Sequence, residues 1–306
     1  MKIVDNIAAL RVHTQLTRTN NAISTSTLRL SSGFRLNSAA DDPAGMAISL
    51  HMRNQIEAMN MADRNVLDGT SMLQTADAAL QDIHNMLQRM RELAVQAGND
   101  VNREWDRWNI QAEIDSLIAE IEDTTRKVEF NNIRLLNGEV QNLRVQAGGR
   151  QHQSISVSLP AFRPWDIGIQ NDPNTPAGVN DHWADAVAGW TGDPPITSTM
   201  TPDMLDRIHV IDAGLANVAL GVLDSAIEQV SRDRAHIGGL LNRFEYTSSG
   251  LQSASLATTQ SLSRVRDTDM AYEMMLLSKS NILSQAGMAI MAQANARPQQ
   301  MLQLLG

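Results

Sequence analysis

Apolar residues recur at every seventh position through residues 59–97, and this repeat constrains the fold more than any other feature of the chain. The first series is Met59, Val66, Leu73, Leu80, Leu87 and Ala94. A second series lies three or four residues away and comprises Ala62, Gly69, Ala76, Ile83, Met90 and Ala97. Two interleaved series form the apolar seam of a coiled coil. Because Asp42 and Pro43 are a strong helix start signal, we predict one long helix from Pro43 to about Gly98.

The same repeat returns near the other end of the chain and predicts a second long helix from about Pro202 to residue 266. Its main series is Leu223, Val230, Ile237, Phe244, Leu251, Thr258 and Val265. Arg234 also falls on the apolar side of this helix. Its guanidinium group is expected either to pair with a carboxylate or to lie at a contact between subunits. Gly238 and Gly239 indicate close packing of helices rather than a phosphate site. Between the two long helices, a shorter helix is predicted from about Arg103 to Val128.

Both ends of the chain are predicted to be helices with apolar residues on two opposite sides. At the N-terminus the first line is Ile3, Ile7, Leu10 and Leu28, and the second is Val12, Leu16, Ile23 and Leu30. In residues 267–306 the first line is Tyr272, Leu276, Leu283, Ala286 and Ile290, and the second is Met270, Met274, Leu277, Met288 and Met291. A helix that rests on a single core shows one stripe. We therefore expect both end helices to have neighbours on two sides, from other copies or from the same chain.

The middle of the chain departs from helical periodicity. Residues 130–138 read as irregular, and alternation around a Gly-Gly pair at residues 143–159 predicts a β-hairpin. Residues 160–203 are rich in proline and predict a surface-exposed tip. The expected fold is mainly α: an elongated antiparallel bundle of long helices with a small β-hairpin region and a short irregular tip. We divide it into residues 1–42, 43–159, 160–203, 204–266 and 267–306.

Composition argues against several classes of function. The net charge of -9 disfavours a nucleic-acid partner, and the absence of cysteine excludes disulfides and thiolate sites. No helical stretch has the apolar length of a membrane span, and the N-terminus does not resemble a secretory signal. The seven histidines lack metal-binding spacing, and no phosphate-loop or hydrolase motif occurs. We expect no enzyme activity, no cofactor and no metal.

Four separate blocks resemble the conserved signatures of bacterial flagellin, the subunit of the flagellar filament. They are residues 30–45 (LSSGFRLNSAADDPAG), 88–97 (QRMRELAVQA), 264–271 (RVRDTDMA) and 292–295 (AQAN). The resemblance covers about residues 1–159 and 204–306, whereas the central segment does not match. It implies a helical filament of identical subunits in the extracellular flagellum. In such a filament the end helices would form the inner tube and the long helices with the hairpin the outer tube.

The resemblance also implies partners. Subunits would be exported unfolded by the flagellar type III apparatus, joined to hook-junction proteins and added beneath a filament cap, while a cytoplasmic chaperone would hold the C-terminal helix before export. The residues expected to mediate self-assembly are Ile3, Ile7, Leu10, Leu16, Ile23, Tyr272, Leu276, Leu283 and Ile290. The block at residues 88–95 also resembles the surface that vertebrate Toll-like receptor 5 recognises. The matching positions are Gln88, Arg89, Leu93 and Glu113, which we expect on one exposed ridge.

Three alternative functions stay open on sequence alone. A hook-associated junction protein or a periplasmic flagellar filament subunit would share the end helices. A secreted effector that acts in solution is a third class. Formation of filaments of constant diameter by purified protein favours flagellin, whereas a monomer that persists at high concentration favours an effector.

Overall fold

Five helices carry most of the residues in the computed structural model, which describes residues 6–170, 183, 186–187 and 207–305. These residues belong to two compact units: unit 1 comprises residues 1–58 and 253–306, and unit 2 comprises residues 59–252. The mainly helical class that we predicted is confirmed, with two small antiparallel hairpins beside the helices. The division into five sequence segments stays a prediction.

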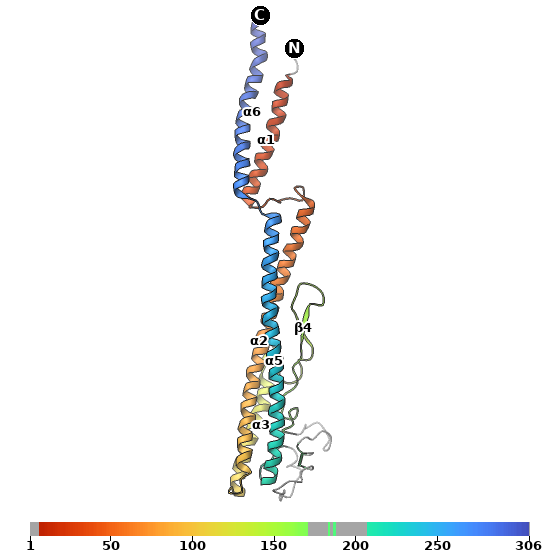
Figure 1. Cartoon of the computed structure of the whole chain (residues 1–306), viewed down its shortest axis with the longest axis vertical. Helices are drawn as coiled ribbons and strands as arrows, with labels where there is room; N and C mark the ends of the chain where they lie inside the picture. The colour runs from red at the N-terminus through yellow and green to blue at the C-terminus, as the bar shows by residue number, and fades with distance from the viewer. Residues whose placement is uncertain (1–5, 171–182, 184–185, 188–206, 306) are drawn as a thin grey trace. The chain divides into compact units, whose positions relative to one another are not determined.

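Unit 1 contains the two end helices, α1 (Ile7–Ser32) and α6 (Met270–Leu305), which lie side by side (Figure 1). They run antiparallel, because Gly287 of α6 lies next to Leu16 and the more N-terminal Glu273 lies next to Arg29. Helix α1 ends at Ser32, and its C-cap Gly33 has a φ of 76°, a left-handed conformation that glycine adopts without steric cost.

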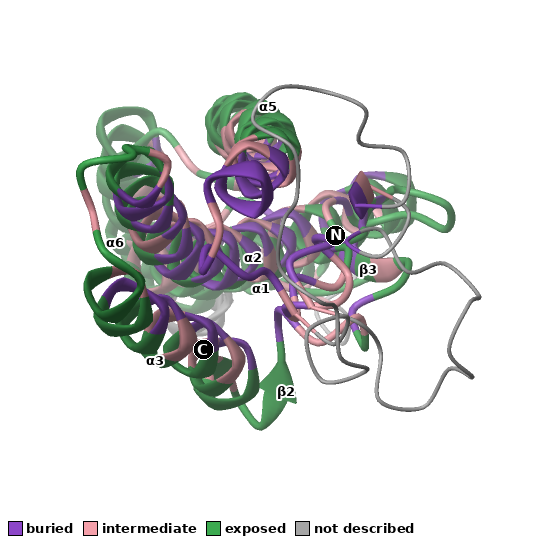
Figure 2. Ribbon diagram, turned by 90° about the horizontal axis from the view of Figure 1, so that it is seen from below, coloured by how far each residue is buried: buried purple, intermediate pink, exposed green. Residues whose placement is uncertain are grey.

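Unit 2 is built on two long helices, α2 (Pro43–Ala97) and α5 (Ala213–Arg266), which also reach into unit 1. The Arg91–Asp224, Asp77–Arg234 and Asp63–Ser248 side-chain contacts show that they are antiparallel. The predicted repeat of α2 is buried from Met59 to Ala97, and that of α5 is buried from Leu223 to Phe244. Figure 2 shows these buried residues along the helices. Arg234 meets a carboxylate, since its Nε donates to Asp77 Oδ1 at 3.0 Å.

A third helix, α3 (Glu104–Lys127), packs antiparallel to α2. Arg89 of α2 pairs with Glu113, and Arg107 of α3 donates to the carbonyl of Ala97 at 2.9 Å. Because α2 has neighbours on two sides, it buries more than its heptad positions. Leu93, which we expected on an exposed ridge, is only 2% exposed and belongs to the core.

The predicted hairpin is confirmed as strands β3 (Leu143–Gln146) and β4 (Ser154–Val157), with Leu143 opposite Val157. A second hairpin, β1 (Glu129–Phe130) and β2 (Ile133–Arg134), lies where we expected irregular structure. Its turn is formed by Asn131 and Asn132, both with positive φ. Asparagine tolerates this left-handed conformation, and the Asn-Asn pair was the signal that the sequence reading missed.

Three further expectations differ from the structure. The second long helix begins at Ala213 rather than near residue 202, because residues 207–210 are held in non-helical pairings: Ile208 N–H bonds the Ile169 carbonyl and Val210 N–H bonds Gln111 Oε1. Gly238 has open space where a Cβ would stand, so close helix packing does not explain it. The segment expected at the surface contributes buried side chains where it is described, namely Phe162, Ile167, Ile169, Trp183 and Val187. The remainder of residues 160–203 lies outside the described residues.

Candidate assembly surface

Two connecting segments join the end helices of unit 1 to the long helices, one between α1 and α2 and the other between α5 and α6. Backbone hydrogen bonds hold these two segments together. The Arg35 N–H donates to the Arg266 carbonyl at 2.7 Å, and the Thr268 N–H donates to the Gly33 carbonyl at 3.0 Å. Arg266 also lies over the Phe34 ring, with its guanidinium carbon 4.0 Å from the ring centroid. The start of α6 is therefore held at the end of α1, and these contacts lie in two of the four blocks that carry the family resemblance, residues 30–45 and 264–271.

Side-chain caps explain why the helices begin where they do around these connections. The Asp269 side chain accepts from the backbone N–H groups of Ala271 and Tyr272 at the start of α6. The Asp42 side chain accepts from Ala44 N–H at the start of α2, as its position before Pro43 predicted. In the connector, the backbone N–H groups of Ser38 and Asn37 hydrogen-bond Asp41 and lower the pKa of its carboxyl group.

The contact between α1 and α6, which we call the seam, is formed largely by small and polar side chains. Its buried or half-buried members are Val12, Leu16, Thr19, Ile23 and Ser26 of α1, and Glu273, Leu277, Ser280, Ser284, Gly287 and Met291 of α6. Asn6 donates to the carbonyl of Ala294 at 2.9 Å, and Ser284 donates to Asn20 Oδ1 at 3.3 Å. The large apolar side chains of the seam are Val12, Leu16, Ile23, Leu277 and Met291, and all five are only half-buried, so they stabilise the helix pair only in part.

A buried carboxylate marks one end of the seam. Glu273 is 4% exposed and its closest ion-pair partner is Arg29, at 3.8 Å. Glu273 Oε1 and Arg29 Nε have no hydrogen-bond partner in the part of the chain that the structure describes. A buried pair of this kind adds little net stability but penalises a helix pairing that would separate the two charges. The lone acid in an apolar helix was the signal from which sequence reasoning could have found this pair.

The apolar side chains of unit 1 lie mostly on its outside. Among the residues that the structure describes, Leu36 is the one large apolar side chain of unit 1 that is buried. The exposed ones on the end helices, which we call the outer face, are Ile7, Leu10 and Leu28 of α1 and Met270, Tyr272, Met274, Met275, Ile282, Leu283, Met288 and Ile290 of α6. Large exposed apolar patches mark surfaces that bind other protein.

The expected self-assembly residues that the structure describes divide between exposed and half-buried positions of the end helices. Ile7, Leu10, Tyr272, Leu283 and Ile290 are exposed on the outer face. Leu16, Ile23 and Leu276 are half-buried, and Ile3 lies outside the described residues. Sequence reasoning missed Ile282 and Met275, which are exposed between the two lines that it followed.

The expected receptor residues come together only in part. Arg89 donates to Glu113 Oε1 through Nε and Nη2, at 2.9 and 2.8 Å, and Nη1 lies 3.3 Å from Glu92. The hydrogen bonds to Glu113, followed by those to Glu92, raise the pKa of Arg89. Gln88 bonds to His84 on the same helix, whereas Leu93 is buried and absent from this surface.

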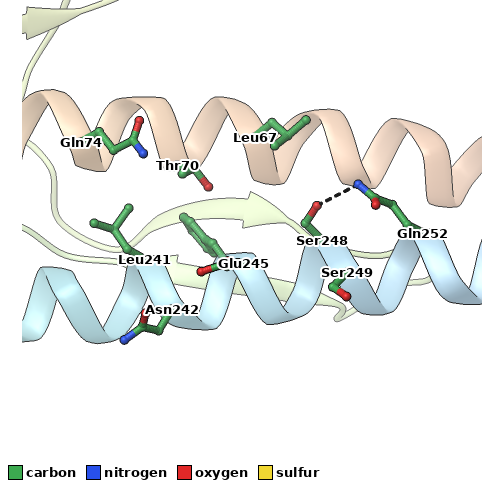
Figure 3. Close-up of a pocket in the computed structure, with 10 residues that line it drawn as sticks. Leu67, Thr70, Gln74, Leu241, Asn242, Glu245, Ser248, Ser249 and Gln252 are labelled. Carbon is green, nitrogen blue, oxygen red and sulfur yellow. Dashed lines mark hydrogen bonds between the residues drawn. The ribbon is translucent and has the colours of Figure 1, made fainter.

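Unit 2 also carries a groove of about 500 Å³ between α2 and α5 (Figure 3). Leu67, Leu241 and Phe244 supply its apolar part, and amide and hydroxyl side chains form its rim, where Gln252 donates to Ser248 at 3.3 Å. Glu245 is the one charged residue among those that line it. Across the described ranges, no group of three or more His, Asp or Glu could hold a metal ion. Within the same ranges, no helix is long and apolar enough to cross a membrane.

Paired end helices with an exposed apolar outer face, joined to long packed helices, define a mainly helical structural protein. Residues 3–141 match the bacterial flagellin N-terminal helical region, and residues 220–305 match the C-terminal helical region. The chain is 39% identical to a flagellin of Bacillus subtilis (strain 168) and 35% identical to one of Treponema pallidum (strain Nichols), over 100% of each chain. A crystal structure of Bacillus cereus flagellin gives a TM-score of 0.45 at 24% identity, over 61% of this chain and 88% of that one.

The chain belongs to the bacterial flagellin family. It is therefore a subunit of a flagellar filament built from identical copies, and the expected family is confirmed. The hook-associated and periplasmic alternatives are not favoured by these matches. The family is a structural one, which favours a role without catalysis.

Proposed function

We propose that the chain polymerises through the outer face of its end helices into an extracellular filament that drives swimming. The single observation that supports this most strongly is the distribution of apolar side chains in unit 1, where Leu36 is buried and the outer face is bare. Each large apolar side chain that becomes fully buried contributes about 1.5–3 kcal/mol. Association of many copies supplies that burial, whereas the free chain leaves the outer face in water.

Export as an unfolded chain by the flagellar type III apparatus is part of the same proposal. A helix pair whose seam has no fully buried large apolar side chain needs little free energy to separate, which suits a chain that must be unfolded for transport. A cytoplasmic chaperone would cover the exposed side of α6 before export, since Leu283 and Ile290 would otherwise promote early association. Outside the cell, the filament cap and the hook-junction proteins would contact the same end helices.

A substitution experiment tests the assembly surface. Replacing Leu283 and Ile290 together by Glu places charges on the outer face, so we expect no elongation of filament seeds in electron micrographs. Thermal unfolding of the free chain should change little, because both side chains are already exposed. Val101→Glu is the matched control: Val101 is an exposed apolar residue of unit 2, and its variant should elongate seeds normally. Elongation by the double variant at the unaltered rate would refute the proposed surface.

Recognition by vertebrate Toll-like receptor 5 is proposed for the surface of Gln88, Arg89 and Glu113. Support comes from the exposure of these side chains and from the Arg89–Glu113 pair, which presents an ordered guanidinium between two helices. Arg89→Ala should reduce signalling by the free chain without unfolding it. Leu93→Ala should lower the stability of unit 2, by about 2–5 kcal/mol for a buried leucine. Unchanged signalling by a folded Arg89→Ala variant would contradict the proposal.

A further inference from the structure

Four methionines of α6 lie on the outer face with their side chains in solvent. Met270, Met274, Met275 and Met288 are between 48% and 58% exposed. Met274 and Met288 are two heptads apart and Met270 lies one turn before Met274, so these three follow one side of the helix, with Met275 on the adjoining flank. Other methionines are protected, since Met59, Met72 and Met90 are buried in unit 2.

The chemistry of the chain directs oxidants to these thioethers. The sequence has 16 methionines and no cysteine, so no thiol of the same molecule competes for a peroxide. Oxidation changes a flexible apolar side chain into a polar one, and a polar group that is buried without a hydrogen-bond partner costs free energy. Met288 lies in the segment from Ser280 to Ala296, which contains no charged residue that could pair with a new sulfoxide dipole.

We propose that Met270, Met274, Met275 and Met288 form an oxidation site that blocks assembly of the free chain. Hydrogen peroxide transfers one oxygen atom to the thioether sulfur, which is oxidised by two electrons to the sulfoxide, and the peroxide is reduced to water. The sulfoxides make the outer face polar, so it no longer packs against other copies. Methionine sulfoxide reductases reverse the change with thiol reductant. The inference rests on the proposed assembly surface and adds its regulation.

The experiment compares oxidised and untreated full-length chain. Free chain is treated with hydrogen peroxide, the peroxide is removed, and oxidised residues are mapped by peptide mass spectrometry. We expect the four α6 methionines to be oxidised before Met72 and Met90, and elongation of untreated filament seeds to be lost. Incubation with both classes of methionine sulfoxide reductase and dithiothreitol should restore elongation. In finished filaments the four methionines should resist the same treatment, because neighbouring copies cover them.

Variants separate this site from other oxidation. Replacement of all four methionines by Leu preserves volume and apolarity, so this variant should elongate seeds with and without peroxide treatment. Met61 is exposed in unit 2 at 55%, and Met61→Leu should still lose elongation after treatment. Loss of elongation by the peroxide-treated fourfold variant, or normal elongation by wild type oxidised at all four positions, overturns the proposal. Untreated wild type that fails to elongate seeds refutes the proposed function itself.

Discussion

Gly69 and Gly238 are glycines inside long helices, yet their surroundings give opposite expectations for substitution by Ala. A Cβ on Gly69 would stand 2.9 Å from Phe244 Cε2 and 3.2 Å from Val145 Cγ2, whereas one on Gly238 would have nothing within 4 Å. Gly69→Ala should destabilise unit 2 by about 1–3 kcal/mol through overpacking. Gly238→Ala should stabilise it by about 0.5–1 kcal/mol, because Ala loses less backbone entropy in a helix. Urea unfolding followed by tryptophan fluorescence measures both; equal effects would contradict the packing around Gly69.

Asp41 gives the connector of unit 1 a pH dependence whose sign follows from its lowered pKa. Its carboxylate accepts from Asn37 and Ser38 N–H at 3.1 and 3.0 Å. Because the folded pKa lies below the ordinary value of 3.8, the stabilisation is present above that value and is lost as pH falls through the folded pKa. Hydrogen exchange at the Asn37 and Ser38 amides, corrected for intrinsic rates, should accelerate on acidification below pH 3.8. The Asp41→Asn variant should lack this acid response; an identical response in both proteins would exclude Asp41 as its source.

At the scale of the element, the seam between α1 and α6 buries no large apolar side chain, and one glycine tests it. A Cβ on Gly287 would stand 3.5 Å from Leu16 Cδ1, an ordinary van der Waals distance. Gly287→Ala should therefore stabilise the pair of α1 and α6. Helix propensity contributes about 1 kcal/mol, and the new contact with Leu16 adds to it. Limited proteolysis of the free chain should remove both ends first and leave about residues 43–266, and Gly287→Ala should slow the first cuts.

Gly250→Ala is the control for that experiment, because it adds the same methyl group to α5 with nothing within 4 Å. It should leave cleavage of the end helices unchanged. First cuts between residues 59 and 97 would instead contradict the packing of α2.

The elements themselves show what the sequence could and could not predict. The α2 and α5 repeats were readable because Leu73, Leu80 and Leu223 follow one strict period and face one core. The side of α6 that contacts α1 could not be predicted from the sequence, because it carries Ser280, Ser284 and Gly287. Both apolar lines of α6 stay largely exposed. Periodicity identifies large apolar residues, and a seam of small polar residues gives no such signal. Burial of Leu93 was equally hidden, since it depends on where α3 packs.

At the scale of the whole molecule, nearly all the large apolar side chains that are buried among the described residues belong to unit 2, so the two units should unfold separately in the free chain. All five tryptophans lie within residues 59–252, which makes tryptophan fluorescence a probe of unit 2 alone, whereas far-ultraviolet circular dichroism follows helices of both units. On heating the free chain, we expect part of the helical signal to disappear while the fluorescence is unchanged. A second, cooperative loss should then appear in both probes.

Assembly into filaments should change the order in which the two units unfold on heating. In the proposed assembly, neighbouring copies cover the outer face in filaments, and anything that binds only the folded state raises its stability. The first helical transition should therefore move to higher temperature and approach the second, without a comparable shift in the fluorescence of unit 2. The Leu283→Glu, Ile290→Glu variant supplies the control, since it should keep the early transition at every protein concentration. A single transition in the free chain, coincident in both probes, would mean that unit 1 is stabilised by contacts within one molecule and does not need other copies.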